Sequence, residues 1–85
     1  MPTWKRTLQL AQRNPKGVKH DNLCRLLEHF GFVGTRPGGG SSHIGYRHED
    51  YADVITLQSG PNGFAPPYQV KLALSALRAL GKIDG

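Results

Sequence analysis

The sequence contains a single cysteine, Cys24, so the chain can form neither an intrachain disulfide nor a cysteine-based zinc site. No run of about 18 apolar residues occurs, so no membrane-spanning helix is predicted. The first residues are polar and basic rather than apolar, so no secretory signal peptide is predicted either. We therefore expect a reduced, cytoplasmic protein that does not enter a membrane, with Cys24 as a small core residue among leucines.

Acidic residues are scarce, with six Asp and Glu against eleven Lys and Arg, which gives a formal net charge of +5. A basic surface on a small protein attracts polyanions, of which nucleic acid is the commonest. The length of 85 residues suits one compact domain, which buries only about 60–65% of the surface of its unfolded chain. The charge favours a nucleic-acid partner, although basic residues can also serve solubility alone.

Two helices are predicted in the first third of the chain. Trp4, Leu8 and Ala11 recur at helical spacing, which predicts a helix from Trp4 to about Arg13. A second and stronger apolar stripe follows, and its members are Leu23, Leu26, Leu27 and Phe30. Asp21 is a candidate N-cap of this second helix, and Gly31 suits the left-handed residue that ends one.

Three strands are predicted next, at Phe32–Arg36, Ser42–His48 and Val54–Leu57, with Glu49–Ala52 as the turn before the third. Short connections between them indicate an antiparallel meander.

The middle strand alternates in character. Ile44 and Tyr46 share one face, and His43, Gly45 and Arg47 share the other.

A loop of prolines and glycines leads into the last predicted helix, which Pro66 and Pro67 can open and Gly81 can close. Its apolar stripe consists of Val70, Ala73, Leu74, Leu77 and Leu80. The same predicted helix also carries a basic stripe made of Lys71, Arg78 and Lys82. This stripe either binds RNA or is simply the solvent-exposed side of an amphipathic helix.

The element order predicts an α+β fold, with a three-stranded antiparallel sheet, helices packed on one face and an extra N-terminal helix. The helix–three strands–helix part matches the layout of a double-stranded-RNA-binding domain. The face that carries His43 and Arg47 is then the open face of the sheet.

His43 is the candidate catalytic residue, because an exposed histidine can transfer protons near neutral pH. RNA needs little more for cleavage, since its own 2′-hydroxyl attacks the adjacent phosphorus and cations can stabilise the charged intermediate. Arg47 and then Arg36 are the nearest candidates for phosphate contact. From the residues alone, a structural role for His43 is the commoner outcome.

The segment before His43 offers backbone N–H groups and two hydroxyls that can cradle a phosphate, and its members are Gly40, Ser41 and Ser42. A flexible hairpin turn is an equally good interpretation. The segment lacks the Lys-Ser or Lys-Thr ending of a P-loop.

The remaining histidines and acidic residues are weaker candidates. His48 is expected to pack or cap, whereas His20 and His29 are expected to be bystanders on a surface helix. Glu49, Asp50 and Asp53 are acidic residues of a turn, where solvation is the usual role, so no metal and no cofactor are predicted.

The ordered set of these features resembles the HicA family of mRNA-cleaving toxins. The similarity runs from Val18 to about Leu80 and includes the helix ending Leu26-Leu27-Glu28-His29-Phe30-Gly31-Phe32 and the Gly-Ser-Ser-His segment that ends at His43. Tyr46 and His48 follow that histidine where the family tends to carry an aromatic and a His or Asn.

The resemblance implies a toxin of a type II toxin–antitoxin system, with metal-independent cleavage of mRNA and inhibition by a HicB-type antitoxin. The family's catalytic histidine falls on His43 and its preceding small residues on Gly40, Ser41 and Ser42. The chain departs from many members after the third strand, where Leu57-Gln58-Ser59 replaces a Pro-x-His segment. A non-catalytic RNA-binding module of the same shape is the alternative.

Overall fold

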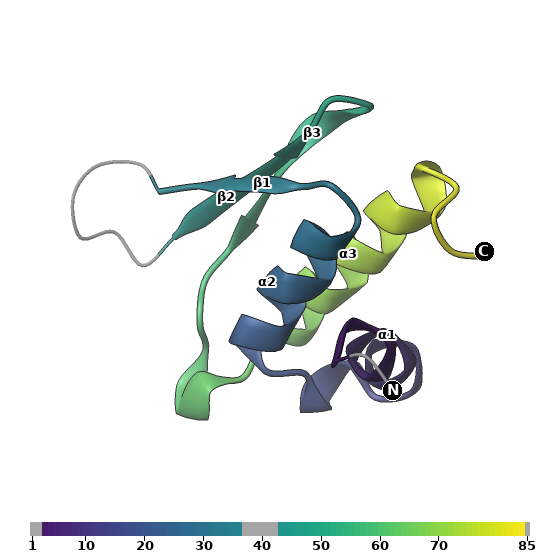
Figure 1. Cartoon of the computed structure of the whole chain (residues 1–85). Coiled ribbons are helices and arrows are strands. Elements are labelled where there is room, and N and C mark those ends of the chain that lie inside the picture. Colours follow the sequence, from purple (N-terminus) through teal and green to yellow (C-terminus); the bar gives the residue numbers. More distant parts are fainter. Residues whose placement is uncertain (1–2, 37–42, 85) are drawn as a thin grey trace.

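A computed structural model describes residues 3–36 and 43–84 of the chain. Its helices are α1 (Thr3–Arg13), α2 (His20–His29) and α3 (Pro67–Ala79), and its strands are β1 (Val33–Thr35), β2 (Ile44–His48) and β3 (Tyr51–Leu57). Short 3₁₀ turns, η1 (Pro15–Gly17) and η2 (Pro61–Gly63), precede α2 and α3. The predicted α+β class and the order of its elements are confirmed (Figure 1).

The three strands form one antiparallel sheet in the order β1-β2-β3. The third strand begins at Tyr51, so the prediction of a turn as far as Ala52 was wrong. Tyr51 already pairs with His48, and an irregularity between Tyr46 and His48 lets extra β3 residues bulge out of the ladder. Such a bulge breaks the alternation of apolar and polar residues, which is the signal that a strand gives in a sequence.

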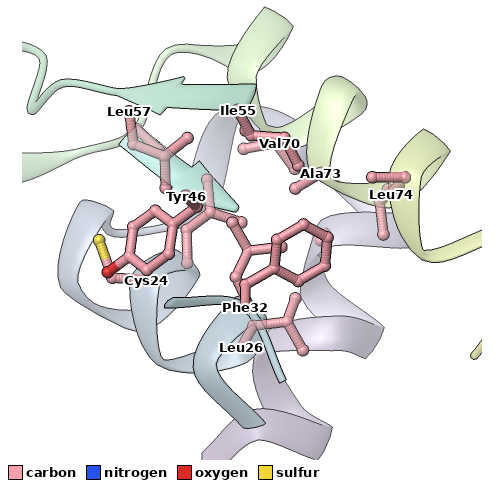
Figure 2. Packing of buried hydrophobic residues seen from close by; sticks show 14 of the residues in the cluster. Cys24, Leu26, Phe32, Tyr46, Ile55, Leu57, Val70, Ala73 and Leu74 are labelled. Atoms are coloured by element: carbon pink, nitrogen blue, oxygen red, sulfur yellow. The ribbon is translucent and has the colours of Figure 1, made fainter. Parts of the chain in front are cut away.

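One face of the sheet packs on the helices and the other is open, as predicted (Figure 1). The buried sheet residues are Ile44, Tyr46, Ile55 and Leu57. They meet the apolar faces of α2 and α3, including Leu26, Val70 and Ala73, in one cluster (Figure 2). The residues predicted to share the other face of β2 lie outside this cluster.

A glycine follows the end of α2 and of α3. Gly31 and Gly81 adopt φ values of +96° and +71°, the left-handed conformation that follows a helix end and that L side chains rarely adopt, as predicted.

The prediction that Asp21 caps α2 was wrong, because Lys19 is the N-cap and makes no side-chain capping bond. The extended segment before α2 pairs with the segment before α3, through a Lys19–Phe64 bridge and an Ala65 N–H bond to the Val18 carbonyl at 2.8 Å. This pairing fixes the point at which the helix begins. Asp21 lies in the first turn of α2, where its negative charge interacts favourably with the positive end of the helix dipole.

Helix α1 packs on α2 and α3, on their side away from the sheet (Figure 1). The indole of Trp4 stacks on the His29 imidazole, with ring centroids 4.0 Å apart, and meets Phe30 edge-on at 5.4 Å. Thr7 and Ala11 are buried on the same side of the helix. The predicted helix from Trp4 to about Arg13 is thus confirmed, and His29 acts as a packing residue.

A hydrogen bond ties the middle strand to α2. The Tyr46 hydroxyl donates to Glu28 Oε2 at 2.7 Å, and the ring itself is buried in the core. A bond to an ionised acceptor is stronger than one between neutral groups. It therefore holds the sheet at a fixed position over the helix.

We predict that Tyr46→Phe lowers the free energy of unfolding by about 1.5 kcal/mol, because it removes a hydrogen bond to a charged group while it keeps the ring. Urea denaturation measures this loss. Tyr51→Phe on β3 is the matched control, because it also removes a tyrosine hydroxyl and keeps a ring that packs on Phe32, and an equal loss in both variants would contradict the assignment.

Candidate functional site

The open face of the sheet contains a hollow of about 240 Å³. Its lining residues are Thr35, Arg36, His43, Gly45, Arg47, Val54 and Thr56. The proposed catalytic histidine and both proposed phosphate-binding arginines thus border one concave surface.

The strand register brings these residues together. Gly45 of β2 lies opposite Thr35 of β1 on one side and Thr56 of β3 on the other, and Arg47 lies opposite Val33. Residues directly opposite in a sheet point to the same face, so this row faces away from the core. His43 immediately precedes β2, and its side chain is exposed at the same face.

The hollow exists because position 45 carries no side chain. A Cβ atom on Gly45 would lie 3.2 Å from Cγ1 of Val54 and 4.0 Å from Oγ1 of Thr35, within the row that lines the hollow. The glycine thus provides a floor of bare backbone between Thr35 and Thr56. A ligand can therefore approach the backbone closely at this position.

The charge of the lining residues suits an anion. Among the described residues that border the hollow, two carry guanidinium groups, one carries an imidazole and none carries a carboxylate. Guanidinium groups match phosphate oxygens with paired N–H donors, and the hydroxyls of Thr35 and Thr56 add further donors.

Lys71, which was also proposed to bind RNA, is not part of this surface. Lys71 is exposed on α3, in the layer on the far side of the sheet, and does not line the hollow. Gly40, Ser41 and Ser42 lie outside the described residues.

His48 packs, as the sequence predicted. Its ring lies against Phe32, with centroids 5.0 Å apart, and its Nδ1 accepts the Asp50 N–H at 3.0 Å. It thus closes the β2–β3 turn on the side away from the hollow.

A second polar cluster lies between α2 and β2, on the core side of the sheet. The prediction that His20 is a surface bystander was wrong, because its ring is buried and its Nε2 lies 3.6 Å from Sγ of Cys24. His20 falls one helical turn before Cys24, so both residues share the inner face of α2. Nδ1 of His20 is buried without a hydrogen-bond partner among the groups that the structure describes.

Cys24 and Tyr46 meet in this cluster, where the hydroxyl end of Tyr46 points to the sulfur (Figure 2). Burial raises the pKa of the Cys24 thiol above its ordinary 9.0, and the Tyr46 hydrogen bond opposes the shift in part. Burial, with hydrogen bonds to Cys24 and Glu28, raises the pKa of Tyr46 well above its ordinary 10.0. Both groups stay protonated, so Cys24 is a structural core residue, as predicted, rather than a reactive thiolate.

Two further properties concern the described ranges 3–36 and 43–84. No group of three or more His, Cys, Asp or Glu side chains there is placed to hold a metal ion. No helix in these ranges combines the length and the apolar character needed to cross a membrane.

Comparison with known proteins gives no relative from which a function can be transferred. No protein-family model matches the chain, and neither a curated protein nor a solved structure matches it.

The raised pKa values of Cys24 and Tyr46 predict a loss of stability at alkaline pH. Folding favours the protonated form of each group, so its contribution is complete below the ordinary pKa values of 9.0 and 10.0 and is lost as the pH rises above them. We expect the free energy of unfolding to fall from about pH 9 upward, and to fall less steeply in Tyr46→Phe. Urea denaturation between pH 7 and 11 tests this, and parallel profiles for the two proteins would contradict it.

Proposed function

We propose that the chain is an RNA-cleaving toxin of the HicA type, with a fold like that of a double-stranded-RNA-binding domain and with His43 as the catalytic residue. One observation carries the proposal. The pairing of β1 with β2 brings three residues to one hollow on the open face of the sheet: Arg36, which follows β1, His43, which precedes β2, and Arg47 of β2. An exposed imidazole between two cations is what metal-independent RNA cleavage needs.

The reaction uses groups of the RNA and of the hollow alone. The imidazole of His43 takes the proton of a ribose 2′-hydroxyl, and the 2′-oxygen forms a bond to the adjacent phosphorus. The bond from phosphorus to the 5′-oxygen then breaks, and the imidazolium returns the proton to that oxygen. The products carry a 2′,3′-cyclic phosphate and a 5′-hydroxyl. Arg36 and Arg47 stabilise the additional negative charge on the phosphorane.

The open face also suits an inhibitor of the HicB type, in keeping with the same proposal. Val33 and Val54 are 64% and 42% exposed on either side of the β2 row. Exposed apolar side chains beside a charged hollow can form the buried apolar centre of an interface with a protein partner. Such a partner would cover His43 at the same time.

We predict that His43→Ala abolishes both growth arrest and mRNA loss when the chain is expressed without an antitoxin. The loss of proton transfer removes at least about two orders of magnitude in cleavage rate. Northern analysis of a stable message over time measures the effect in cells. Purified protein with EDTA and a defined RNA measures the cleavage rate and identifies the cyclic phosphate.

His29→Ala is the matched control, because it also removes an imidazole but lies on α2 outside the hollow. It is expected to keep full activity. Unchanged toxicity of His43→Ala would disprove its catalytic role, and RNA binding without any cleavage by wild-type protein would favour the non-catalytic RNA-binding module.

We further predict that Gly45→Val blocks cleavage and preserves the fold. Valine suits a strand, but its side chain occupies the floor of the hollow and keeps the phosphate away from His43. Circular dichroism checks the fold and the EDTA-treated assay checks the cleavage rate. A folded and fully active variant would show that RNA does not enter the hollow.

A further inference from the structure

The N-terminal segment, made of α1 and the residues that lead to α2, carries a concentration of positive charge that the hollow on the sheet does not use. Five of the eleven Lys and Arg residues, and none of the six Asp and Glu residues, lie within the first twenty positions. The remainder of the chain has six residues of each sign, so the net charge of +5 belongs to this segment. Its basic residues are Lys5, Arg6, Arg13, Lys16 and Lys19, and all five are exposed.

The helical period sorts this segment into two sides. Trp4, Thr7 and Ala11 face α2 and α3, whereas Arg6 and Arg13 project from the opposite side. Arg13 follows Arg6 by seven positions, so the two residues lie about 10 Å apart along the helix axis.

The two guanidinium groups flank a built depression rather than a flat surface. Arg6, Gln9, Leu10, Arg13 and Asn14 line a concavity of about 430 Å³. Its amides and guanidinium groups are the donors that most often contact phosphate oxygens.

We propose that this face of α1 binds the phosphate backbone of RNA, as an anchoring surface separate from the hollow that contains His43. The inference rests on the proposed function in that RNA is the ligand. A protein partner fits less well, because a protein interface needs an apolar centre. Leu10, 41% exposed, is the one large apolar side chain that the structure shows exposed on α1.

The position of α1 makes the contribution of this anchoring surface depend on the length of the RNA. The helix lies outside α2 and α3, whereas the hollow lies on the opposite face of the sheet (Figure 1). An RNA that occupies both surfaces must pass around a body of 36 × 31 × 22 Å. A short RNA can fill the hollow but cannot reach α1 at the same time, so the anchor selects long strands.

The test compares RNA lengths and uses RNA that cannot be cleaved. Wild-type protein and the double variant Arg6→Ala/Arg13→Ala are titrated with 2′-O-methyl RNA, as a tetranucleotide and as an unstructured strand of about 30 nucleotides. Fluorescence anisotropy gives the affinity at several salt concentrations. Because the blocked 2′-oxygen prevents cleavage, failure of the nuclease proposal does not affect this measurement.

We expect the double variant to bind the long strand about 25-fold more weakly at 0.1 M salt. Each phosphate contact on a single strand adds about 0.7 to the slope of log affinity against log salt, so two lost contacts lower that slope by about 1.4. The affinity for the tetranucleotide stays at the wild-type value.

Arg78→Ala/Lys82→Ala is the matched control, because it also removes two exposed cations, but from the C-terminal end of α3. It is expected to keep the preference for the long strand. Equal weakening by both pairs would assign the effect to net charge or to the basic stripe of the last helix rather than to α1 in particular, and would overturn the proposal. If the Arg6→Ala/Arg13→Ala variant bound the long strand with wild-type affinity, the proposal would be overturned as well. Loss of binding to a protein inhibitor, with RNA affinity unchanged, would instead assign this face of α1 to a protein partner.

Discussion

The structure depends on the two-sided packing of β2. On one side, Tyr46 fills the core and its hydroxyl reaches Glu28 on α2, which fixes how the sheet lies on the helices. Gly34 of β1 lies opposite Tyr46, and a Cβ there would lie only 2.8 Å from the ring, so the neighbouring strand leaves room for this one side chain. Because side chains alternate along a strand, the placement of Tyr46 also fixes Gly45 and Arg47 on the open face.

This coupling explains why a small chain can present a defined site. A domain of this size has a thin core and little chain to spare for loops that position functional groups. The hollow is instead made from the outer face of the strand whose inner face holds the core together. The energy that keeps Tyr46 in place thus also holds Arg47 in register with Val33, without further residues devoted to the site.

Much of this arrangement could be predicted from the sequence, because periodicity and alternation report which side of an element is buried. The stripes of α2 and α3 and the alternation of β2 predicted the layers and placed His43 and Arg47 on the open face. The start of β3 could not be predicted, since a bulge interrupts its alternation. The burial of His20 could not be predicted either, because a histidine counts as a polar residue in the hydrophobic pattern of a helix whether its side chain is buried or exposed. Likewise, the hollow depends on cross-strand pairs such as Gly45 with Thr56, and pairing is a tertiary property.

The position of the positive charge on the surface could not be predicted from the sequence either. Composition predicted a polyanion partner, but a net charge has no position until the fold assigns one. In the folded chain two arginines border the hollow on the sheet, and two others, Arg6 and Arg13, border a separate concavity on α1. The body of the protein separates these two basic surfaces, which lie on opposite sides of the sheet. Under the proposed function, this separation would let a small site with few contacts release its product while the distant cations hold the rest of the strand by electrostatic attraction.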